Sequence, residues 1–148
     1  MTTTDNTATA VNPRAVALAT CLGIDLSEVS QNNWSKDTFE VGRAEYLVLT
    51  DDEANERAAE YIKETLWAFN VDFLASHFSA DLDADALAAL KEMQGTRCES
   101  ANPLLLALVK DFDHLVEDAI ASDGRGRFMS PYNGEELEQG EYFIYRTN

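Results

Sequence analysis

The chain has 148 residues, a length typical of one domain with its own hydrophobic core. It carries 27 acidic against 11 basic residues, and a formal net charge of −16 disfavours direct binding to nucleic acid or to anionic membranes. Hydrophobic residues make up 45% of the chain, which excludes a disordered acidic tail. Cys21 and Cys98 are too few for a disulfide framework and fit a reducing cytoplasm.

Residues 1–11 (MTTTDNTATAV) are small and of low complexity, and we expect them to be disordered. They have neither the basic start nor the apolar core of a secretion signal, and no later apolar run reaches membrane-spanning length. The sequence therefore predicts a cytoplasmic protein with one folded domain over 12–148.

In the first half, Asn12-Pro13 is typical of a helix start and predicts a helix over 13–22 that ends at Gly23. The apolar run 46–49 predicts a buried central strand, with 38–41 pairing beside it. The capping box Thr50-Asp51-Asp52-Glu53 predicts a helix over 51–69.

In the second half, Asn70 is expected to cap a short helix over 71–77, and Asp83 a helix over 84–94 that ends at Gly95. Asn102-Pro103 predicts the start of a long core helix that ends at Gly124. Phe128-Met129 and 142–145 are expected to be strands, with a turn at Asn133-Gly134. The predicted fold class is α+β, with four to five helices packed on a small, mainly antiparallel sheet built from the central strand and the C-terminal strands.

The acidic residues are concentrated in 51–120, which contain 16 acids and 5 bases. Along the predicted helix 51–69, acids recur every three or four residues and should form one exposed stripe, although like charges at this spacing destabilise an isolated helix. Such a face is either simply solvated or imitates a phosphate backbone for a basic partner. The residues predicted to bind a partner are Glu53, Glu56, Glu60, Glu64, Asp111, Asp113, Glu117 and Asp118.

A calcium loop is the first alternative site, because Asp81, Asp83, Asp85 and Glu92 match four positions of its template. The position that needs glycine is Ala86, and Ala84–Met93 are predicted to form an amphipathic helix that a calcium loop would break. Helix capping is therefore the preferred interpretation.

A metal face is the second alternative, because His114 lies three or four residues from Asp111, Glu117 and Asp118. One helix cannot supply a full ligand set, and His77 is the only other histidine. We therefore predict neither a metal nor a cofactor.

Catalytic signatures are weak. No Ser, Thr or Cys lies in a nucleophile elbow or beside an evident base, so we expect no enzyme. Gly124-Arg125-Gly126-Arg127 could cradle an anion but lacks the Lys-Ser/Thr ending of a phosphate loop, and it more simply ends a helix before a strand.

Two segments resemble small acidic proteins of tailed bacteriophages: Glu45–Ala54 (EYLVLTDDEA) continuing to Trp67–Asn70, and Asp123–Arg146 (DGRGRFMSPYNGEELEQGEYFIYR). The resemblance covers about a third of the chain and implies a context, the cytoplasm of an infected bacterial cell, rather than an activity. In that context we expect an acidic, nucleic-acid-mimicking inhibitor of a basic host protein that handles nucleic acid, such as a CRISPR effector or a restriction enzyme. The alternative is a phage assembly accessory protein with an oligomeric apolar interface.

Overall fold

The computed structural model describes residues 12–32 and 34–148, so the segment predicted to be disordered (1–11) lies outside the described residues. The chain forms two compact units. We call the part up to Asn55 together with Arg125–Asn148 the sheet unit, and Glu56–Gly124 the helical unit. The α+β class is confirmed. That both units fold as one domain stays a prediction.

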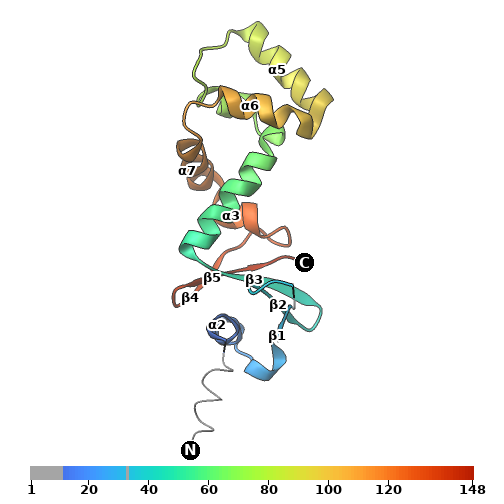
Figure 1. The fold of residues 1–148 in the computed structure, drawn as a ribbon, viewed down its shortest axis with the longest axis vertical. Helices are drawn as coiled ribbons and strands as arrows, with labels where there is room; N and C mark the ends of the chain where they lie inside the picture. The colour runs from blue at the N-terminus through green and yellow to red at the C-terminus, as the bar shows by residue number, and fades with distance from the viewer. Residues whose placement is uncertain (1–11, 33) are drawn as a thin grey trace, which may run out of the picture. The chain divides into compact units, whose positions relative to one another are not determined.

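The sheet unit is built on an antiparallel sheet of five strands in the order β1-β2-β3-β5-β4 (Figure 1). The strands are β1 (Ser30–Gln31), β2 (Thr38–Val41), β3 (Ala44–Thr50), β4 (Leu137–Gln139) and β5 (Tyr142–Arg146). The central position of β3, its pairing with β2 and the strand at the C-terminal end confirm the predictions.

Two tight turns set the register of the sheet. Gly42, with φ of +62°, and Gly140, with φ of +63°, each begin a two-residue hairpin loop. Glycine is favoured there because a side chain would strain a positive φ. The Asn133-Gly134 turn that the sequence predicts is present, with Gly134 at φ +70°, but it precedes β4 and does not join the C-terminal strands.

Helix α2 (Pro13–Leu22) packs against β3, β4 and β5 and forms the core of the sheet unit. Asn12 caps it by accepting a hydrogen bond from the Arg14 backbone, and Gly23 ends it at φ +68°, as predicted. The strand residues that alternate toward α2 are apolar, as a half-buried strand requires. The buried core residues are Ala15, Leu18, Phe39, Tyr46, Val48 and Ile144.

The remaining helical segments are η1 (Leu26–Glu28), α3 (Asp51–Glu64), η2 (Leu66–Ala68), α4 (Val71–Ala75), α5 (Ala84–Arg97), η3 (Cys98–Ala101), α6 (Asn102–Leu108), α7 (Phe112–Asp123) and α8 (Arg125–Met129). Helix α3 begins in the sheet unit and continues into the helical unit, and α8 belongs to the sheet unit. Among the described residues, no helix has both the length and the apolar character needed to cross a bilayer.

The predicted helix 51–69 ends early because Asn102 intervenes. Its side-chain nitrogen donates to the Glu64 carbonyl at 2.7 Å, and its side-chain oxygen accepts from the Trp67 amide at 2.9 Å. The chain after Glu64 therefore turns into the short segment η2. Asn102, the first residue of α6 as predicted, thus also links two segments of the helical unit.

The predicted long helix from Asn102 to Gly124 is also wrong, since it breaks between α6 and α7. Val109 pairs with Phe78 in an isolated bridge, and the Lys110 amide donates to the His77 carbonyl at 2.8 Å. Asp111 then starts α7 as its N-cap.

Two smaller predictions are corrected. Helix α5 continues through Gly95 to Arg97, and Phe128-Met129 lie in α8 instead of a strand. Gly124, with φ of +86°, ends α7 as predicted, but the rest of the Gly-Arg segment lies in helix α8 and does not lead into a strand.

Candidate functional site

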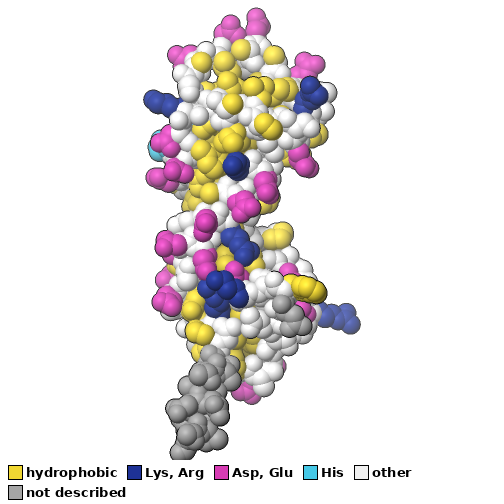
Figure 2. Space-filling view, viewed as in Figure 1, with side chains coloured by type: hydrophobic (Ala, Val, Ile, Leu, Met, Phe, Trp, Pro, Cys, Tyr) yellow, Lys and Arg dark blue, Asp and Glu magenta, His cyan; other side chains and the backbone are white. Residues whose placement is uncertain are grey.

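The exposed acidic face of α3 is the first candidate site, and it consists of Glu56, Glu60 and Glu64. Their spacing places them along one stripe, while Ala58 and Ile62 on the same helix are fully buried. All three carboxylates are exposed, and within the described residues none forms an ion pair or a side-chain hydrogen bond. In Figure 2, acidic side chains lie mainly along the outline of the helical unit, around a more apolar centre.

Glu53, the first residue of the predicted stripe, has a different environment in the sheet unit. Its carboxylate forms a two-pronged ion pair with Arg14 at 2.7 and 3.0 Å and accepts from the Thr50 amide at 2.8 Å. The hydrogen bond from Arg14 lowers the pKa of Glu53 to about 2, against burial, and the Thr50 amide adds to the effect. Glu53 is therefore a structural carboxylate of the capping box.

A second half-buried arginine in the sheet unit, Arg125, binds two further acids. Arg125 contacts Asp51 at 2.8 Å and Glu136 at 2.7 Å. Burial alone would lower the pKa of Arg125, but hydrogen bonds to Glu136 and Asp51 outweigh it and raise the pKa. The Tyr145 hydroxyl also donates to Glu136. Several acids of the sheet unit are thus neutralised locally, unlike those on the acidic face of α3.

The four predicted acids of α7 divide into two kinds. Asp113 and Glu117 are exposed. Asp111 accepts from the His114 amide at 3.2 Å and caps the helix. Asp118 lies 2.9 Å from His77, so it has a local partner.

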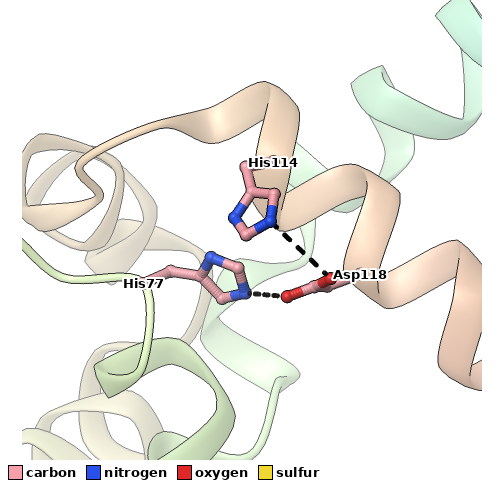
Figure 3. A group of neighbouring side chains, drawn as sticks. All are labelled: His77, His114 and Asp118. Carbon is pink, nitrogen blue, oxygen red and sulfur yellow. Dashed lines mark ion pairs between the residues drawn. The ribbon is translucent and has the colours of Figure 1, made fainter.

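A compact cluster of two imidazoles and one carboxylate is the second candidate site (Figure 3). His77 follows α4, whereas His114 and Asp118 lie one turn apart on α7. The His77 Nε2 is 2.9 Å from Asp118 Oδ2, the His114 Nε2 is 4.0 Å from Asp118 Oδ1, and all three ligand atoms lie within 4.8 Å of one another. We call these residues the His-Asp cluster.

Backbone pairing fixes the His-Asp cluster in place. The His77 carbonyl accepts from Lys110, and the Ser79 amide donates to the Leu108 carbonyl at 2.9 Å, so the chain after α4 is joined to the α6–α7 connection. The His77 ring also packs against Phe73, with centroids 5.2 Å apart, and meets His114 edge to face at the same separation. His77 is buried, while the side chains of His114 and Asp118 are 62% and 49% exposed.

The sequence singled out His114 and Asp118 but could not place His77 beside them. The backbone pairing between the chain after α4 and the α6–α7 connection brings the three residues together. No local sequence pattern indicates this pairing. The calcium-loop alternative fails for a local reason: Asp83 accepts from the Ala86 amide at 2.8 Å and caps α5, so the later template residues, Asp85 and Glu92, lie in a helix instead of a loop.

A pocket of about 130 Å³ lies in the sheet unit, lined in part by Leu22, Tyr46 and Arg146. It is smaller than the cavities of about 300 Å³ or more that usually hold metabolites. Comparison of the chain with protein-family models, curated proteins and solved structures finds no match. The function of this acidic α+β protein therefore has to be inferred from its own residues.

Proposed function

We propose that the chain is a non-enzymatic interaction protein that binds a basic partner through the acidic face of α3. The observation that carries the proposal is that some acidic side chains are paired with arginines whereas those on the acidic face of α3 are not. Glu53 and Glu136 are held by half-buried arginines, whereas Glu56, Glu60 and Glu64 are exposed at a spacing that leaves like charges side by side.

The charge of the whole helical unit supports the same proposal. It contains 14 acidic against 5 basic residues, and Asp113 and Glu117 of α7 add exposed carboxylates. A surface of this kind speeds association with a positively charged partner and discriminates against acidic ones.

The partner we propose is a host protein that handles nucleic acid. The commonest basic surfaces of a cell are those built to hold a phosphate backbone, and a row of carboxylates imitates that backbone. The resemblance to small phage proteins favours a defence protein, such as a CRISPR effector or a restriction enzyme, and inhibition as the outcome of binding.

The test is affinity capture from a bacterial lysate, followed by elution with duplex DNA. The wild-type chain is expected to retain basic proteins that DNA fragments release, because DNA and the acidic face compete for one groove. The variant Glu56→Gln, Glu60→Gln, Glu64→Gln is expected to bind at least about 10-fold more weakly, since it removes three charges from the contact.

The matched control neutralises three exposed acids of the sheet unit, Glu40→Gln, Glu138→Gln and Glu141→Gln, and so has the same net charge. It is expected to capture the same proteins as the wild type. Equal losses in both variants would mean that only net charge matters, and an unchanged capture by the α3 variant would refute the proposal.

The assembly alternative has one observation in its favour. Strand β4 is an edge strand of the sheet, and Leu137 on it is exposed. An edge strand with apolar surface can pair with a second copy. Light scattering at low and high salt separates the alternatives: a stable oligomer that is insensitive to salt and is lost in Leu137→Lys would favour assembly.

A further inference from the structure

We propose that the His-Asp cluster binds one divalent transition-metal ion, with zinc as the natural choice, through His77 Nε2, His114 Nε2 and a carboxylate oxygen of Asp118. This inference is independent of partner binding by α3. It reverses the expectation, drawn from the sequence, that no metal is bound.

The ligand set is the first support. Imidazole nitrogens and one carboxylate form the donor set of many zinc sites with three protein ligands, and the same set suits nickel and cobalt. Both histidines of this 148-residue chain lie in the cluster, although 37 positions separate them in the sequence. A histidine that only fills the core would not need the second one beside it.

The geometry is the second support. Two atoms bound to one tetrahedral zinc ion at about 2.0–2.1 Å lie roughly 3.3 Å apart. The observed separations of 2.9 and 4.0 Å lie on either side of that value. The His114 side chain is 62% exposed, so a small rotation can shorten its 4.0 Å separation from Asp118. His77 is held in place by the hydrogen bond from the Lys110 amide to its carbonyl and by packing against Phe73.

The surroundings are the third support. The helical unit carries a net negative charge, which raises the local concentration of divalent cations. Because His114 and Asp118 are open to solvent, water can complete the coordination. The bound ion would tie α7 to the connection after α4, so its most direct effect is to stabilise the helical unit.

The experiment is a titration of the untagged full-length chain, first treated with a chelator, with ZnCl2 and in parallel with MgCl2. We expect one zinc ion per chain, a higher melting temperature with zinc, and no comparable effect of magnesium. Co2+ in place of zinc should give the visible absorption of a site with nitrogen ligands.

The diagnostic variants are His114→Ala and Asp118→Asn, because both side chains are substantially exposed and their replacement should leave the fold intact. Each is expected to weaken zinc binding at least about 10-fold. Asp113→Asn, on the same helix, is the control and should bind like the wild type. Equal zinc affinity in wild type and His114→Ala, or zinc binding no tighter than magnesium binding, would overturn the proposal.

Discussion

At the scale of single residues, Glu53 and Glu56 show how neighbouring acids on one helix take different roles. Glu53 is bound by Arg14 and Thr50, whereas Glu56 points into solvent without an ion pair among the described residues. Removing one partner of a half-buried pair leaves the other without its hydrogen bonds, which costs more than removing an exposed charge. The two residues should therefore respond differently to substitution.

Glu53→Gln should lower the free energy of unfolding at pH 7 by on the order of 2 kcal/mol, a value reduced for the 26% exposure of the side chain. The pKa of Glu53 is about 2 in the folded protein against a usual 4.5. Its contribution is therefore complete above about pH 4.5 and is lost as the pH falls toward 2. In denaturant unfolding, the free energy of unfolding of the wild type should fall between pH 7 and pH 3, and it should fall less in the variant. Glu56→Gln is the control, and an equal effect of both substitutions would contradict this assignment.

Gly126 lies where no side chain fits. A Cβ there would be 2.6 Å from the Gly134 carbonyl oxygen and 2.9 Å from the Glu136 amide nitrogen, both backbone atoms that cannot rotate away. Gly126→Ala should lower the free energy of unfolding by about 1–3 kcal/mol. Gly95→Ala, in open space inside α5, should instead stabilise by about 0.5–1 kcal/mol. Thermal unfolding of both variants would show the opposite signs, and a neutral Gly126→Ala would disprove the close approach.

At the scale of elements, the start of a helix could be predicted from the sequence better than its end. Thr50 and Glu53 form the capping box that their spacing indicates, and Asn12, Asn70 and Asp83 all cap the helices assigned to them. Caps are local, since the side chain and the amides it binds lie within three residues.

The end of α3 and the break after α6 depend on distant residues and were missed for that reason, whereas Gly23 and Gly124 end their helices as predicted. Asn102 lies 38 positions from Glu64, to whose carbonyl it donates a hydrogen bond. The spacing of apolar residues along the chain does not predict such a contact. The break before α7 depends on the pairing of Val109 with Phe78, although Asp111 ahead of an apolar run was a cap signal that could have revealed it. The same pairing brings His77 to the His-Asp cluster, so one of its three residues could not be placed there from the sequence.

Helix α7 should depend measurably on its cap. Asp111→Ala removes the acceptor for the His114 amide and should lower the free energy of unfolding by about 1 kcal/mol. Asp113→Ala, an exposed residue of the same turn, should change it by less than about 0.5 kcal/mol. Urea unfolding compares the two, and equal effects would show that charge near the helix start matters more than the cap.

At the scale of the whole molecule, the net charge of −16 should oppose compactness. Added NaCl screens repulsion among exposed acids more than it weakens the half-buried pairs of Arg14 and Arg125. The melting temperature is therefore expected to rise between about 0.02 and 0.5 M NaCl. A fall would mean that the ion pairs of the sheet unit dominate the electrostatics of the fold.

The same salt series applied to binding tests the function most directly. The dissociation constant of a captured and purified partner would be measured against NaCl concentration for the wild type and for Glu56→Gln, Glu60→Gln, Glu64→Gln. Binding through the acidic face of α3 predicts that wild-type affinity falls steeply with salt, and that the variant binds more weakly with a shallower dependence. Equal affinity and equal salt dependence of the two proteins would contradict it.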